Sequence, residues 1–183
     1  NRRDFTLSSL ATVGALSAAG PLYAADTKNR RIVLASRPTG KPTMENLRLE
    51  STRIPGLEKG QVLLKTLYLS LDPYMRGRMS AGPSYADNVK IDQVMVGGTV
   101  SEVVASRNKQ WAVGQRVNSF SGWQEYDVSS GAGLTPLDPR INPESYALGV
   151  LGMPGLTAYV GLLDLGEPKP GETVVLAAST GAV

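Results

Sequence analysis

A run from Gly60 to Leu71, GQVLLKTLYLSL, limits the folds open to this chain more than any other feature. In an extended strand successive side chains point to opposite faces, and here both faces are partly apolar. One face carries Leu63, Leu67, Leu69 and Leu71, and the other carries Val62, Leu64 and Tyr68. A strand that is apolar on both faces belongs inside a sheet rather than at its edge. The run therefore predicts a central β-strand.

Short strand-like segments separated by turn residues surround this run. Residues 31–38 are rich in β-branched side chains and end at a proline, and further runs occupy 93–106 and 115–130. Glycines interrupt the two later segments and predict turns or bends within them. This spacing of strands and turns predicts a partly open barrel or sandwich from about residue 29 to about residue 130.

Two Asx-Pro pairs predict short helices, because Asp and Asn cap helix N-termini and proline suits the first helical position. Asp72-Pro73 predicts a helix that continues to Arg76, and Asn142-Pro143 predicts one that reaches Leu148. Residues 152–166 then repeat apolar side chains at helical spacing and place Gly166 as the C-terminal cap.

The chain ends in an apolar run followed by small residues. Thr173 to Ala178 predicts a buried strand, and Ser179, Thr180 and Gly181 form a loop at its carboxyl end. A strand entering such a loop can open a nucleotide-binding βαβ unit, since small side chains let backbone N–H groups approach a pyrophosphate. A plain strand and turn explains the segment equally well. Because the chain starts with Asn and stops here, we expect it to be a piece of a longer protein.

The composition excludes several kinds of chemistry. The 183 residues include no cysteine and no histidine, which removes disulfides, Cys/His zinc sites and Ser-His or Cys-His catalytic pairs. A net charge of +3, from 19 basic and 16 acidic side chains scattered along the chain, gives no electrostatic support for nucleic-acid binding. We therefore expect no metal site and no nucleic-acid partner.

Residues 1–25 resemble a targeting segment. Arg2 and Arg3 precede a mildly apolar stretch rich in Ala, Gly, Ser and Leu that ends in small residues, which is the layout of a secretory signal of twin-arginine type. The stretch is too interrupted for a membrane anchor. The alternative is a helical extension that carries an arginine pair by chance. The first interpretation predicts a periplasmic protein, and the second leaves a cytoplasmic one.

Four strings in this order resemble the zinc-independent medium-chain dehydrogenase/reductases. They are NRRIVLASRPTGKPT, VLLKTLYLSLDPYMRGRM, GMPGLTAYVGLLDLG and KPGETVVLAASTGAV. The most similar group is that of the NADPH-dependent 2-alkenal, leukotriene and prostaglandin reductases, with the bacterial curcumin reductases. The resemblance implies a mainly β, GroES-like barrel over residues 29–130. Residues 131–183 would be connecting helices and the first strand of a truncated α/β Rossmann domain.

The resemblance also implies a reaction and its residues. NADPH would give a hydride to the β-carbon of an α,β-unsaturated ketone or aldehyde, and the α-carbon would be protonated. Tyr74 would donate a hydrogen bond to the carbonyl oxygen, where charge develops, although core packing explains this residue equally well. Thr157, Ser179, Thr180 and Gly181 would contact the cofactor. Arg76 and Arg78 could steer an anionic group, but solvated surface arginines are favoured.

Other functions stay open at this point. A quinone reductase of the same superfamily has the same chain features, and an exported barrel could act as a non-catalytic small-molecule binding module. The expected partner is a small enone substrate. The sequence does not decide whether two copies form a homodimer.

Overall fold

The computed structural model describes residues 27–83, 86–177 and 181. The twin-arginine-like segment 1–25 and the predicted cofactor residues Ser179 and Thr180 lie outside the described residues. Export through that segment therefore stays a prediction.

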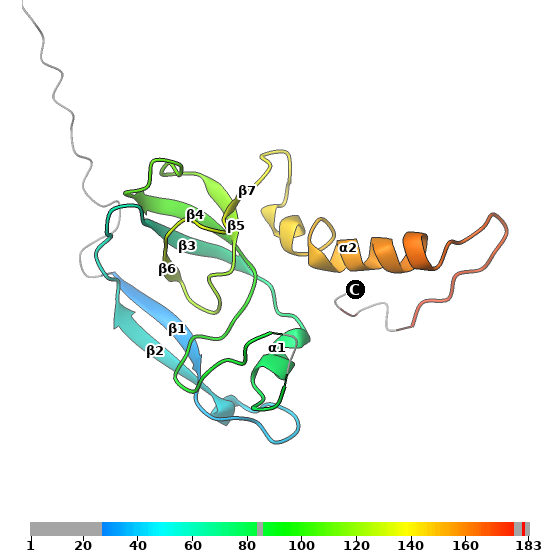
Figure 1. The fold of residues 1–183 in the computed structure, drawn as a ribbon, viewed down its shortest axis with the longest axis horizontal. Helices are drawn as coiled ribbons and strands as arrows, with labels where there is room; N and C mark the ends of the chain where they lie inside the picture. Colours follow the sequence, from blue (N-terminus) through cyan, green and yellow to red (C-terminus); the bar gives the residue numbers. More distant parts are fainter. Residues whose placement is uncertain (1–26, 84–85, 178–180, 182–183) are drawn as a thin grey trace, which may run out of the picture.

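Two antiparallel sheets make up the larger part of the structure (Figure 1). The first pairs β1 (Lys28–Leu34) with β2 (Leu47–Arg53). The second has the order β6-β3-β4-β5-β7. Its strands are β3 (Val62–Leu69), β4 (Thr99–Ser106), β5 (Arg116–Ser119), β6 (Tyr126–Ser129) and β7 (Thr135–Pro136).

The predicted central strand is confirmed. β3 pairs with β4 on one side and with β6 on the other. Val62, Leu63 and Leu64 are completely buried, as expected for a strand that is apolar on both faces. The second half of the strand is half-exposed, and a register shift between Thr66 and Tyr68 accompanies the change.

Backbone hydrogen bonds from β1 join the two sheets into a partly open barrel. The Ile32 N–H donates to the Trp123 carbonyl at 2.8 Å, and the Ile32 carbonyl accepts from the Met95 N–H at 3.0 Å. The Leu34 N–H donates to the Gln93 carbonyl at 3.0 Å. These bonds satisfy the outer edge of β1, which would otherwise expose unpaired polar groups. The barrel predicted for residues 29–130 is thus present, although residues 93–98 are a loop rather than a strand.

Separate apolar clusters fill the barrel. One, formed by Val62, Leu64, Val103 and Val117, lies inside the larger sheet, with Trp111 and Leu134 packed against it. A second lies under the short helix α1 (Tyr74–Arg78) and consists of Leu34, Met75, Met79, Val89 and Met95. A third consists of Val100, Leu137 and Ala147, with Ile141 and Leu148 packed against it. The second cluster fixes α1 against the barrel, and with it the side chain of Tyr74, which packs on the same cluster.

The predicted helices form, but their caps differ from the prediction. α1 begins after Pro73, which occupies the N-cap position itself, and no side chain caps the helix. The 3-10 helix η2 (Glu144–Leu148) likewise begins after Pro143 without a side-chain cap. In α1 the Asp72 main-chain carbonyl, rather than its carboxylate, holds the first turn by accepting from the Met75 N–H at 3.1 Å. A further short 3-10 helix, η1 (Met44–Asn46), precedes β2.

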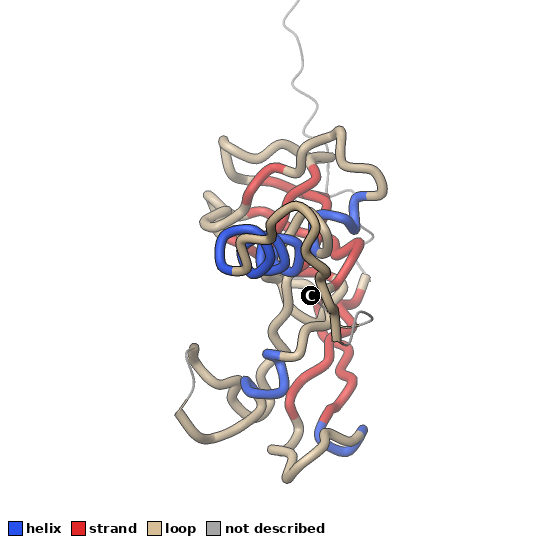
Figure 2. The backbone as a smooth tube through the Cα atoms, turned by 90° about the vertical axis from the view of Figure 1, so that its right-hand side faces the viewer, coloured by secondary structure: helices blue, strands red, loops and turns tan. Residues whose placement is uncertain are grey.

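A helical arm follows the barrel. α2 (Met153–Tyr159) continues directly into the π-helical segment η3 (Val160–Leu165), and Gly166 is the C-cap as predicted. The two extend away from the strands in Figure 1 and are seen nearly end-on in Figure 2. We call residues 150–177 the arm. Within the part of the chain that the structure describes, no helix is long and apolar enough to cross a membrane.

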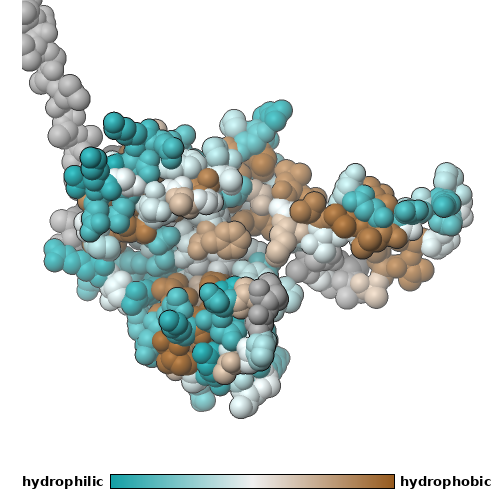
Figure 3. Space-filling view, viewed as in Figure 1, coloured by the Kyte–Doolittle hydropathy of each residue, from teal (hydrophilic) through white to brown (hydrophobic). Residues whose placement is uncertain are grey.

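The strand predicted for Thr173 to Ala178 is wrong for the residues that the structure describes. Residues 173–177 are irregular and exposed, with 87% of Val175 accessible to solvent. A strand forms only where a neighbour accepts and donates its ladder hydrogen bonds. No described strand lies beside this segment to do so. The apolar side chains of the arm therefore face solvent (Figure 3).

Candidate functional site

A cavity of about 690 Å³ lies at the end of the barrel from which the arm departs. The wall is formed by the segment between β3 and α1, α1 itself, the residues just before β4, the end of β5, the residues around the start of β7, and the segment from η2 to the start of α2. The lining includes polar residues, among them Ser70, Asp72, Tyr74, Arg78, Asn118 and Ser119. It also includes apolar residues, among them Val96, Phe120, Leu148, Leu151 and Met153. A mixed wall of this kind suits a largely apolar organic molecule that carries one or two polar atoms.

The sequence left two places open for Tyr74, in the core packing and in the site, and the structure puts it in both. It is half-buried and packs against the apolar cluster under α1, and it also lines the cavity. The packing fixes the ring, and the position at the first turn of α1 places the residue in the cavity wall. A tyrosine held in this way can offer its O–H to a bound molecule at low entropic cost.

Asn118 is a site residue that the sequence did not reveal. It lies on β5 and lines the cavity, and its side-chain oxygen is buried with no hydrogen-bond partner among the described residues. A buried amide oxygen without a partner is costly unless something else donates to it. In the sequence Asn118 stands between Val117 and Ser119 as an ordinary polar strand residue, so no local signal marks it.

Arg76 and Arg78 of α1 were expected to be solvated surface arginines. The structure gives them other surroundings. Arg76 is half-buried and ties α1 to the loop before β2, donating to the carbonyls of Gly40 at 2.7 Å and Pro38 at 3.3 Å. Arg78 lines the cavity, while its Nε donates to the Asp87 carbonyl. Arg76 is thus a structural residue, and Arg78 brings a positive charge to the cavity wall.

The mouth of the cavity is apolar and open. Phe120, just after β5, has 82% of its surface exposed, and Leu151 and Met153 at the start of the arm are also exposed. Exposed apolar side chains gathered around a cavity indicate a binding surface.

The predicted cofactor residues are separated in the structure. Thr157 is exposed on α2, and its hydroxyl donates to the Met153 carbonyl at 2.8 Å, one turn earlier in the helix. Gly181 lines a different cavity of about 560 Å³, beside Pro73 and Arg76 on the other side of the α1 start. The described residues thus place neither in the large cavity, and their cofactor role stays a prediction.

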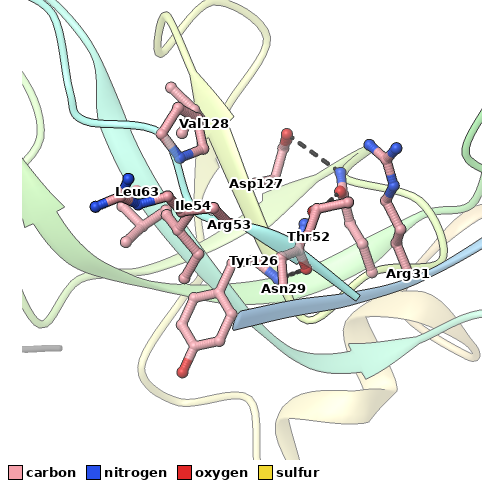
Figure 4. A pocket seen from close by; sticks show the side chains of 11 residues that line it. Asn29, Arg31, Thr52, Arg53, Ile54, Leu63, Tyr126, Asp127 and Val128 are labelled. Carbon is pink, nitrogen blue, oxygen red and sulfur yellow. Dashed lines mark hydrogen bonds between the residues drawn. The ribbon is translucent and has the colours of Figure 1, made fainter. Parts of the chain in front are cut away.

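A third, smaller pocket of about 380 Å³ lies between β1, β2 and β6. Asp127 on β6 lines it together with Asn29, Arg31 and Arg53 (Figure 4). Burial raises the pKa of the Asp127 carboxyl above its ordinary value, and hydrogen bonds from Ser121, the Val128 backbone and Gln124 oppose this rise only in part. Asp127 therefore holds its proton more tightly than a solvated aspartate.

Comparison with known proteins shows which proteins this chain is similar to. Residues 30–137 match the family model described as the N-terminal domain of oxidoreductase. The chain is 59% identical over 156 residues to the NADPH-dependent curcumin reductase of Escherichia coli (strain K12), which covers 85% of this chain and 45% of that protein. It is 45% identical over 147 residues to prostaglandin reductase 1 of Mus musculus, covering 79% and 43%.

A solved structure agrees with the same assignment. CurA from Vibrio vulnificus, determined alone and in complex with NADPH, matches with a TM-score of 0.77 and 55% sequence identity. The match covers 84% of this chain and 45% of CurA. The chain therefore spans about half the length of the relatives it matches.

Proposed function

Because the chain belongs to the family of N-terminal oxidoreductase domains, in the zinc-independent medium-chain branch, we propose that it supplies the substrate-side half of an NADPH-dependent enone reductase. The observation that carries this proposal is the cavity itself. Its wall combines apolar side chains with the phenol of Tyr74. Relatives whose names specify curcumin and prostaglandin reduction support the same substrate class.

The residues of the cavity fit the nicotinamide end of NADPH. The unpartnered side-chain oxygen of Asn118 can accept a hydrogen bond from a carboxamide N–H, and Val96 and Leu148 offer apolar surface to a flat ring. Arg78 adds a positive charge to the same wall. When bound, NADPH supplies a hydride for the β-carbon of the substrate.

Tyr74 acts on the carbonyl end of the substrate. As the β-carbon gains a hydride, negative charge moves to the carbonyl oxygen, and a hydrogen bond to that oxygen becomes stronger. The packing of Tyr74 on the cluster under α1 holds its ring in the cavity wall, so little freedom of the ring is lost when a substrate binds. Phe120, Leu151 and Met153 contribute apolar surface for the hydrocarbon part of the enone.

Isotope tracing with the full-length protein tests the proposal. The protein is incubated with benzylideneacetone and NADPH deuterated at the transferable position of its nicotinamide, and the product is examined by NMR. We expect the saturated ketone with one deuterium on the β-carbon. Turnover of a quinone without any saturated ketone would replace this function with quinone reduction. Absence of turnover with either substrate would favour a non-catalytic binding module.

A further inference from the structure

Gly98, just before β4, stands in the wall of the large cavity without a side chain. Its φ lies outside the left-handed region that favours glycine, so the backbone does not require a glycine here. Its carbonyl accepts from the Ser70 N–H at 2.9 Å, which fixes this part of the backbone against the segment that follows β3. What distinguishes the position is therefore the space that a side chain would fill.

The pairing of β4 with β5 shows which way that space faces. Val100 is paired with Asn118, and directly paired residues of antiparallel strands point to the same face. Asn118 lines the large cavity. Side chains alternate along an extended chain, and continued past the start of β4 this alternation puts Gly98 and Val96 on the same face. Val96 also lines the cavity, so Gly98 is a gap between two valines on the face that Asn118 shares.

The surroundings of two neighbouring glycines agree with this direction. A Cβ on Gly98 would meet one described atom within 4 Å outside its chain neighbours, the Leu148 Cδ2 at 3.7 Å, which is an ordinary contact. A Cβ on Gly97 would instead overlap the Leu69 Cδ1 at 2.8 Å and press on the Met75 Cε at 3.1 Å. Gly97 thus faces the cluster under α1, and Gly98 faces open space beside Leu148, another residue of the cavity wall.

This open space, which we call the Gly98 notch, combines apolar surface with one polar group. Val96, Val100 and Leu148 surround it, and Val100 and Leu148 belong to the same apolar cluster. Asn118 is the diagonal neighbour of Gly98 across β4 and β5, at about 7–8 Å. Its side-chain oxygen is buried without a partner among the described residues. A flat ring in the notch could therefore reach this oxygen with an amide group attached to the ring.

We propose that the Gly98 notch seats the nicotinamide ring of NADPH, and that the absence of a side chain at residue 98 is what makes room for the ring. This proposal rests on the proposed function, which takes its hydride from NADPH. A methyl group at residue 98 would fill the notch without disturbing the barrel, because it meets only Leu148 and at contact distance. Gly98→Ala should therefore fold like the parent and bind the ring less well.

Binding measurements on the full-length protein separate the ring from the rest of the cofactor. Isothermal titration calorimetry gives Kd for NADPH and for adenosine 2′,5′-bisphosphate, which has no nicotinamide ring. We expect Kd for NADPH to rise about tenfold in Gly98→Ala and about a hundredfold in Gly98→Val, as for methyl groups forced into space that is already filled. Kd for the bisphosphate should change by less than about twofold in either variant, because this molecule has no part that enters the notch.

Gly56→Val is the matched control. Gly56 lies in the loop between β2 and β3, has no positive φ, and would place a Cβ more than 4 Å from any other described residue outside its chain neighbours. It does not line the large cavity. The control therefore adds the same side chain away from the notch and should leave both Kd values unchanged. The Tm of each variant without ligand shows that it is folded.

Fluorescence of bound NADPH gives a second readout, because its emission depends on the surroundings of the reduced nicotinamide ring. In the parent we expect stronger emission from bound NADPH than from NADPH in water. In Gly98→Val saturated with NADPH the emission should return toward that of the free cofactor. Equal emission in the parent and in this variant would mean that the ring does not lie in the notch and would overturn the proposal.

The binding results also distinguish the notch from its alternatives. An unchanged Kd for NADPH in folded Gly98→Ala and Gly98→Val would overturn the proposal, and a raised KM for benzylideneacetone in the same variants would assign the notch to the substrate. Equal losses for NADPH and the bisphosphate would assign the effect to the fold and would overturn it as well. The expected NADPH pattern in a protein that reduces no enone would overturn the proposed function and leave the nicotinamide seat in place.

Discussion

The barrel and the arm use similar side chains in opposite ways. In the barrel Leu34, Leu63 and Leu64 are completely buried, whereas in the arm 64% of Leu156 is exposed and Leu165 is still more accessible. Both regions have regular secondary structure and a high share of apolar residues. The difference lies in tertiary partners, because the barrel closes on itself through β1 and the arm has no second layer among the described residues.

This contrast shows which part of the chain carries its own stability. A helix of the length of α2 and η3 is marginal in water without packing of its apolar face. Exposed apolar patches of this kind mark an interaction surface. The barrel therefore forms the stable frame of the candidate site, and the arm contributes the apolar mouth of the cavity through Leu151 and Met153.

A leucine in each region gives the largest expected difference. Leu64→Ala leaves a hole in the cluster inside the barrel and should lower the free energy of unfolding by about 2–5 kcal/mol. Leu156→Ala removes an exposed side chain and should change it by less than about 0.5 kcal/mol. Urea unfolding of the chain measures both. Similar losses would mean that the arm is packed in solution and that the contrast is wrong.

Two glycines test how the barrel closes. Gly122 and Gly114 both have a positive φ, of 73° and 89°, so an alanine at either is strained by about 1–3 kcal/mol. At Gly122 a Cβ would also overlap the Met95 carbonyl oxygen, whereas at Gly114 it would meet nothing. Gly122→Ala should therefore be less stable than Gly114→Ala by a further ~1–3 kcal/mol in the same unfolding experiment. Equal values would show that the loop can move without cost to closure.

Charge placed on the arm should change association rather than stability. Leu165→Lys with Val175→Lys breaks the exposed apolar surface and should reduce self-association in sedimentation experiments, with little change in Tm. Val113→Lys is the control, since it adds a charge at an exposed apolar residue of the barrel. An equal effect of the control would point to net charge rather than to the arm.

The smallest expected effect is on the pH dependence of stability and comes from the carboxyl of Asp127. Because the folded state raises the pKa of Asp127, stability gained from its protonated form is complete below the unfolded pKa and is lost as pH rises through the folded one. Asp127→Asn should therefore gain stability relative to the parent as pH rises through that range. Asp164→Asn, on the exposed arm, controls for the loss of one negative charge. Unfolding at several pH values tests the difference, and parallel behaviour of the two variants would contradict it.

The sequence predicted the barrel because its strongest signals are local. The two apolar faces of residues 60–71 required a central strand, and β3 is one. β2 was missed because LRLESTR combines charged and apolar residues without a turn signal, and only pairing with β1 makes it a strand. The helix caps were mistaken because proline itself took the N-cap position.

Parts of the site could not be read from the sequence, since they depend on distant segments. Asn118 becomes a cavity residue only when β5 meets the turn before α2, and Asp127 becomes a buried acid only when β1 and β2 close over β6. The strand at 173–178 was predicted from composition alone. It needs a neighbouring strand that the described residues do not include.

The central claim is that Tyr74 is the hydrogen-bond donor of a reductase site at the end of the barrel. The most direct measurement is kcat for an enone in the full-length Tyr74→Phe variant, with Tyr68→Phe on β3 as the control because Tyr68 does not line the cavity. We expect kcat to fall about tenfold to a thousandfold in Tyr74→Phe, with NADPH affinity nearly unchanged, as for the loss of one oxyanion donor. The control should retain its kcat. An unchanged kcat in Tyr74→Phe would assign this tyrosine to packing under α1 and contradict the claim.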